Sequence, residues 1–194
     1  MKKSILLITV VAISMFLTAG TAFALNFNYP GLSGTSYTDT NIFPGVDMTI
    51  SATGGSLTWD SSDNGIGIQD DEVSGNTNEA LSFSFTKTMN IDDFYIVDLF
   101  PDDNGAGAET GLYSIEVNGT PYGPQSFGPG NNAGDFTLPL NTQVDMITFF
   151  ADDNGFKDFA VAGFKGEPVP EPGTIVLLGL GLVGVAAYRR KARK

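Results

Sequence analysis

The chain has 194 residues, is 42% hydrophobic and carries a formal net charge of −12. It contains no cysteine and no histidine, which excludes disulfides, thiolate or imidazole zinc sites, and catalysis by a cysteine nucleophile or a histidine base. Most of the lysines and arginines lie at the two ends, whereas all 22 acids lie between Asp39 and Glu171. We do not expect nucleic acid as a partner, because so acidic a segment repels phosphates. The same charge attracts divalent cations, or serves solubility alone.

The first segment has the three parts of a cleavable signal peptide. A basic start, Met1-Lys2-Lys3, precedes an apolar run over residues 4–17, and Ala22 and Ala24 are small residues at the two positions that signal peptidase reads. The apolar run is short for a membrane-spanning helix, which is the competing interpretation. We therefore expect residues 1–24 to be a signal peptide, cleaved after Ala24, that directs export across the inner membrane.

Residues 25–168 are expected to form one all-β domain. Apolar and polar residues alternate with a period of two, which is typical of strands with one buried face. Turn residues such as Gly, Asn, Asp and Pro separate the runs. The alternating runs cover residues 46–51, 81–86, 113–117 and 136–139, and the more continuously apolar runs cover 91–100 and 144–150. This pattern predicts an antiparallel β-sandwich, jelly-roll-like in kind, with a closed barrel as the alternative.

Trp59, the only tryptophan, lies among polar residues at the start of an acidic stretch. An exposed tryptophan can stack on a sugar ring, which makes Trp59 a candidate ligand-binding residue, whereas burial in the core is the structural alternative. The stretch that follows, up to Glu79, is dense in carboxylates. These carboxylates repel one another unless solvent or a cation intervenes, so a structural cation is a further expectation here.

A partial repeat at an offset of 50 residues places two acidic turns after two apolar strands. Each copy ends in Phe-x-Asp-Asp-Asn-Gly. Calcium prefers oxygen ligands of this kind, although Asp and Asn also favour tight turns for purely local reasons. The candidate Ca²⁺ ligands are Asp102, Asp103, Asn104, Asp152, Asp153 and Asn154. Because the two strands are equivalent in the repeat, we expect both turns at related edges of the sandwich.

The chain ends in a short apolar segment between two prolines and a basic tail. Pro170, Glu171 and Pro172 precede an apolar run over residues 174–188, and five of the last six residues are basic. A helix of this length is about 22 Å long, shorter than the hydrocarbon core of about 30 Å, so it requires local thinning of the membrane. The basic tail is expected to stay in the cytoplasm, which places the acidic domain outside.

This C-terminal arrangement resembles the PEP-CTERM sorting signal. The resemblance covers residues 169–194 and rests on the Pro-Glu-Pro tripeptide, the Gly- and Leu-rich apolar segment and the Arg-rich end in that order. It implies that an integral-membrane exosortase recognises Pro170, Glu171 and Pro172 and removes the tail. It also implies a Gram-negative bacterium that makes extracellular polysaccharide, and a product at the cell surface or outside the cell. An ordinary single-pass C-terminal anchor is the alternative.

Three functions follow as hypotheses. The first is a non-enzymatic protein that binds exopolysaccharide or another polymer of the extracellular matrix or biofilm, with Ca²⁺ as a bridge or a stabilising ligand. The second is a glycosidase that uses two carboxylates, for which the sequence shows no particular pair. The third is a purely structural or adhesive subunit without sugar specificity.

Overall fold

The computed structural model describes residues 22–61, 64–69, 72–75, 78–102, 107–151, 158–170, 179–181 and 188. Over these residues the fold is antiparallel β-structure, as expected. The only helical residues among them are 179–181 and 188, and Gly75 has a 3-10 conformation. The strands are β1 Phe23–Asn26, β2 Ser36–Phe43, β3 Val46–Thr53, β4 Leu57–Asp60, β5 Gly65–Ile68, β6 Ala80–Val97, β7 Gly111–Val117, β8 Thr120–Phe127, β9 Phe136–Ala151 and β10 Ala160–Pro168.

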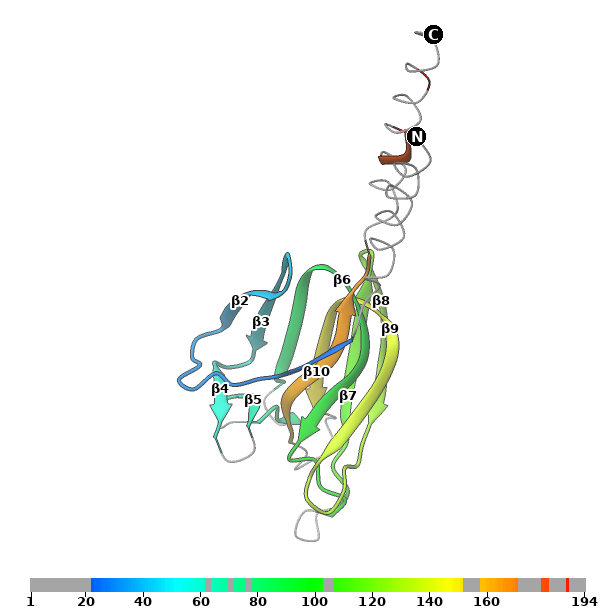
Figure 1. The fold of residues 1–194 in the computed structure, drawn as a ribbon. Helices are drawn as coiled ribbons and strands as arrows, with labels where there is room; N and C mark the ends of the chain where they lie inside the picture. The colour runs from blue at the N-terminus through cyan, green and yellow to red at the C-terminus, as the bar shows by residue number, and fades with distance from the viewer. Residues whose placement is uncertain are drawn as a thin grey trace.

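Two long strands, β6 and β9, build a sandwich by running through both of its layers. The first half of β6 pairs with β3 on one side and with the second half of β9 on the other. The second half of β9 also pairs with β7, which in turn pairs with β8. The second half of β6 pairs with β10, which also pairs with β1 and β5. Figure 1 shows β2 and β3 on one side of the molecule and β8 and β9 on the other. The pairing path of the described strands ends at β4 and β8, so it does not close into a barrel.

The change of layer occurs where β6 and β9 lose their regular register. The pairing shifts between Ser84 and Met89 of β6, and Thr86 and Lys87 in this interval are exposed. Asp145 of β9 fixes the bend, because its carboxylate accepts hydrogen bonds from the Thr88 hydroxyl and from the Asn118 amide in the turn between β7 and β8. An irregular register of this kind bends and twists a strand.

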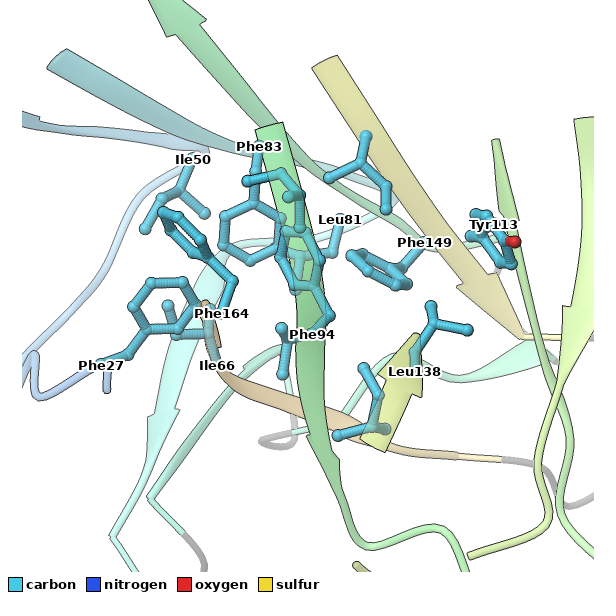
Figure 2. Packing of buried hydrophobic residues seen from close by; sticks show 14 of the residues in the cluster. Phe27, Ile50, Ile66, Leu81, Phe83, Phe94, Tyr113, Leu138, Phe149 and Phe164 are labelled. Carbon is cyan, nitrogen blue, oxygen red and sulfur yellow. The ribbon is translucent and has the colours of Figure 1, made fainter. Parts of the chain in front are cut away.

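Aromatic side chains from both layers fill the interior. Figure 2 shows Phe27, Phe83, Phe94, Phe149 and Phe164 gathered between the strands. The ring centroids of Phe94 and Phe149 lie 5.2 Å apart, and those of Phe94 and Phe164 lie 5.4 Å apart. Phe83, Phe94, Phe149 and Phe164 are fully buried. Aromatic pairs at these distances contribute about 0.5–1.5 kcal/mol beyond the area that they bury, so the core is well able to hold the two layers together.

The two ends of the β domain meet on β10. Ala24 of β1 lies opposite Lys165, and Leu25 lies opposite Phe164. Beyond the end of β10, the Val169 amide still donates a hydrogen bond of 2.9 Å to the Thr88 carbonyl. The residues near both expected processing sites therefore adjoin β10: those at the N-terminal site pair with it, and Val169 follows it and bonds to β6. Among the described residues, no helix has the length and apolarity needed to cross a membrane; most of the apolar run at 174–188 lies outside them.

Candidate functional site

A shallow hollow with two tyrosines in its wall lies between the loop that follows β1 and the edge strand β2. It has a volume of about 400 Å³. Its lining consists of Asn28, Tyr29, Pro30, Gly31, Leu32, Ser33 and Tyr37. The Tyr37 side chain is 38% exposed, and its ring centroid lies 5.1 Å from that of Tyr29 at an interplanar angle of 56°. The hollow thus offers two tilted aromatic rings beside polar groups, a combination that suits a flat ligand with one apolar face and several hydroxyls.

The loop is held in place by main-chain hydrogen bonds to β3 and β4. The Leu32 amide donates to the Tyr29 carbonyl, which closes a turn around Pro30 and Gly31. The Leu57 amide donates to the Gly34 carbonyl at 2.7 Å, and the Ala52 amide donates to the Thr35 carbonyl at 2.9 Å. Gly31 and Gly34 have φ values of +83° and +86°, a region in which glycine is favoured. The hollow is therefore a built part of the sandwich.

Tyr29 is the fixed element of the hollow. Its hydroxyl donates a hydrogen bond of 2.6 Å to Asp39 Oδ2 on β2. Burial of the phenol, followed by this hydrogen bond and the charge of Asp39, raises the pKa of Tyr29 well above its usual range. Tyr29 therefore remains a neutral donor over the whole physiological pH range, and the Asp39 carboxylate holds its ring in one orientation.

Trp59 supports the hollow and does not line it. The indole is half-buried against the core, and its centroid lies 6.4 Å from that of Tyr29 in an edge-to-face arrangement. The lining tyrosines, Tyr29 and Tyr37, were not singled out from the sequence. The signal that could have found them is the Tyr-Pro-Gly turn and the Ser-Tyr pair in a loop rich in Gly and Ser.

Of the six residues predicted to bind calcium, the structure describes only Asp102, which is exposed. Asp103, Asn104, Asp152, Asp153 and Asn154 lie outside the described residues. The segments that lead into the two turns reach the same end of the sandwich. Before the first turn, the Phe100 carbonyl accepts a hydrogen bond from the Glu109 amide, and before the second turn, Ala151 lies opposite Gly111. Glu109 and Gly111 are only two residues apart in the chain, so Phe100 and Ala151 lie close to the same place. Within the described part of the chain, no three acidic side chains are arranged to hold a metal ion.

Two carboxyl groups at this same end share a hydrogen bond. Glu72 bonds to Asp158, with Asp98 and Glu109 nearby. Burial raises the pKa of Glu72 to about 9, and the hydrogen bond and charge of Asp158 contribute to the rise. At neutral pH the Glu72 carboxyl is therefore protonated and acts as the donor to Asp158. The shared proton reduces the repulsion between these two groups.

The processing residues lie at the borders of the described structure. Ala22 precedes β1, and Ala24 is exposed within β1 opposite Lys165. Pro170 is exposed and follows directly after Val169, whose amide donates a hydrogen bond to the Thr88 carbonyl of β6. Glu171 and Pro172 lie outside the described residues.

Comparison with known proteins gave one family match and distant structural neighbours. Residues 168–191 match the family model described as the PEP-CTERM protein-sorting motif. No curated protein matched the chain. One solved structure, a mutant of CBM29-2 from a study of ligand recognition by family 29 carbohydrate-binding modules, is 12% identical with a TM-score of 0.44, covering 76% of this chain and 91% of that one. Another, GH31 CBM32-2 bound to GalNAc, is 16% identical with a TM-score of 0.40, covering 64% of this chain and 99% of that one.

The motif match defines the class of the chain as a protein with a C-terminal sorting signal, which follows the antiparallel β domain. The chain is a PEP-CTERM domain-containing protein, and the matched motif supports its processing by an exosortase. The match covers the C-terminal end of the chain and identifies how the protein is sorted.

Proposed function

We propose that the protein is a non-catalytic component of the extracellular matrix that binds polysaccharide in the hollow formed by Tyr29 and Tyr37. The sorting motif supports export, and the family implies a cell that makes extracellular polysaccharide. The observation that carries the proposal is the pair of tilted tyrosine rings, of which one is anchored by Asp39 and the other is partly exposed. Sugars present an apolar face to an aromatic ring and hydroxyls to neighbouring polar groups, and Asn28 and Ser33 supply such groups here.

The proposal is tested by retention of the protein in gels that contain polysaccharide. The full chain is purified in a detergent without a sugar head group and run through native gels with and without acidic or neutral exopolysaccharide. Retention in the wild type and its loss in Tyr37→Ala are expected. Tyr122→Ala is the matched control, because Tyr122 is 53% exposed on the edge strand β8. Equal retention of both variants would contradict a binding role for the hollow.

Calcium at the Asp102–Asn104 and Asp152–Asn154 turns is part of the same proposal. An anionic protein and an acidic polysaccharide repel each other directly, and a shared divalent cation removes that repulsion. Retention of the wild type on an acidic polysaccharide should then increase with Ca²⁺, and the combined Asp102→Asn and Asp152→Asn substitutions should remove the increase. Retention on a neutral polysaccharide should not respond to Ca²⁺.

A glycosidase is the second candidate, and the carboxyl pair of Glu72 and Asp158 is the observation that brings it forward. One neutral acid and one carboxylate are the chemical groups that such an enzyme requires. However, Glu72 and Asp158 are directly hydrogen-bonded, whereas the carboxyls of retaining and inverting glycosidases are about 5–9.5 Å apart. This spacing leaves no room for a sugar between them. Release of reducing ends from a polysaccharide by the wild type, and not by Glu72→Gln, would establish the enzyme instead.

A further inference from the structure

Glu79, directly before β6, has a buried carboxylate that is only half satisfied. The residue is 2% exposed. Its Oε2 accepts a hydrogen bond of 2.8 Å from the Ser74 amide. Its Oε1 is buried and has no hydrogen-bond partner among the described residues. A buried carboxylate oxygen of this kind is strongly unfavourable unless a positive charge or a donor reaches it.

No described lysine provides that charge. Lys165 forms an ion pair with Asp92, with 3.1 Å between Nζ and Oδ2. Lys87 lies eight residues further along β6, which corresponds to about 26 Å of extended strand, and its Nζ is near Gly45. The other lysine of the central segment, Lys157, lies outside the described residues.

The Gly54 turn and the Ser74 amide hold the Glu79 side chain in its buried position. The Gly54 turn packs against it so closely that a Cβ atom at Gly54 would lie 3.0 Å from Glu79 Cγ. The Gln69 side-chain amide in turn donates a hydrogen bond of 2.8 Å to the Gly54 carbonyl. The carboxylate is thus enclosed between the Gly54 turn and the chain segment that contains Gln69 and Ser74.

We propose that Glu79 Oε1 is a ligand of a structural Ca²⁺ ion bound between the Gly54 turn and this segment. The segment from Asp60 to Glu79 is among the parts of the sequence richest in acids and amides, and the further oxygens that Ca²⁺ requires would come from peptide carbonyls and water. Calcium fits better than magnesium, because it accepts six to eight oxygens in an irregular arrangement. The proposed ligand, Glu79, is not one of the six residues predicted to bind calcium at the two Asp-Asp-Asn turns, and the site does not depend on polysaccharide binding.

The test measures calcium binding and thermal unfolding of the full chain in detergent, with Ca²⁺ alone as the probe. The wild type should bind Ca²⁺ in equilibrium dialysis, and its melting midpoint should rise in a saturable way, because a ligand that binds only the folded state stabilises it. Glu79→Gln should lose this rise and one equivalent of bound Ca²⁺. Glu116→Gln on β7, which removes the same charge, should keep both. The combined Asp102→Asn and Asp152→Asn variant should also keep the Glu79-dependent rise.

A calcium response in Glu79→Gln equal to that of the wild type would overturn the proposal, as would a wild type that binds no Ca²⁺ at millimolar concentrations. If Glu79→Gln does not fold, Glu79→Asp decides the question. It keeps the charge but withdraws the carboxylate by one methylene, so half-saturation should move to higher Ca²⁺. An unchanged half-saturation in Glu79→Asp would equally overturn the proposal.

Discussion

The rings of Phe83 and Phe94 lie 5.8 Å apart between centroids, although both residues belong to the single strand β6. Eleven residues of extended strand span about 36 Å. The contact therefore exists only because β6 bends at residues 86–88 and returns on the other layer of the sandwich. Phe83 also contacts Phe27 and Phe149, so the bend is stabilised by aromatic rings from several strands.

Phe94→Ala should destabilise the fold strongly. Phe94 is fully buried and contacts Phe83, Phe149 and Phe164, and removing such a ring from a core costs about 3–5 kcal/mol. The free energy of unfolding, measured with urea, should fall by that amount. Tyr122→Ala, at an exposed position of β8, should change it by less than about 0.5 kcal/mol. Similar losses in the two variants would show that Phe94 does not lie in the core.

Much of the strand content followed from the sequence, because one buried face imposes a period of two. The runs at 46–51 and 113–117 lie in β3 and β7. The runs at 81–86 and 91–100 form most of one strand, β6, and those at 136–139 and 144–150 are likewise joined in β9. The joining was not predictable, since it depends on long-range pairing across an irregular bend. β8 was not predicted, because Pro121 and Pro124 lack the amide hydrogen that a strand in the middle of a sheet needs. β8 lies at the edge of the sheet, where a strand tolerates proline.

Less of the candidate site than of the strand content could be predicted from the sequence. Trp59 was chosen for its residue type, and the structure places it next to Tyr29, which lines the hollow. Tyr29 and Tyr37 meet only because β2 pairs with β3 while the preceding loop is bonded to β3 and β4. The unpartnered oxygen of Glu79 is likewise a property of packing, which no local pattern encodes.

Tyr29→Phe should separate the role of the hydroxyl from that of the ring. The substitution keeps the aromatic surface but leaves Asp39 without its 2.6 Å hydrogen bond. A bond to a charged group contributes about 1.5–3 kcal/mol, and partial exposure places the expected loss of stability at the low end of that range. Tyr29→Ala should in addition abolish retention in polysaccharide gels. If Tyr29→Phe lowers neither stability nor retention, the hydroxyl has no part in ordering the hollow.

Stability should fall as the pH rises from about 4.5 to about 9, through the contribution of Glu72. Its pKa is raised from 4.5 to about 9 in the folded protein, chiefly by burial. In this interval the folded chain keeps a proton that the unfolded chain releases, so raising the pH favours unfolding. The groups that face Glu72 are Asp158, Asp98 and Glu109, and their negative charges strengthen the effect.

The measurement is the free energy of unfolding of wild type and Glu72→Gln at several pH values within this interval. The variant cannot release a proton at this position, so its stability should decrease less with pH. Comparison with the variant removes the contributions of the other acids, which both proteins share. Identical slopes for the two proteins would show that Glu72 is ionised in the folded state.

Removal of the C-terminal tail should depend on Glu171 and not on Glu167, although both are acids near the same chain end. The Pro-Glu-Pro tripeptide begins directly after Val169, whose amide donates a hydrogen bond to the Thr88 carbonyl, whereas Glu167 lies before the tripeptide, inside β10. In a host with an exosortase, Glu171→Gln should accumulate with its tail, whereas Glu167→Gln should be processed like the wild type. The intact mass of the membrane and released fractions distinguishes the two forms. Equal processing of both variants would mean that the tail is removed by a protease that does not read the tripeptide.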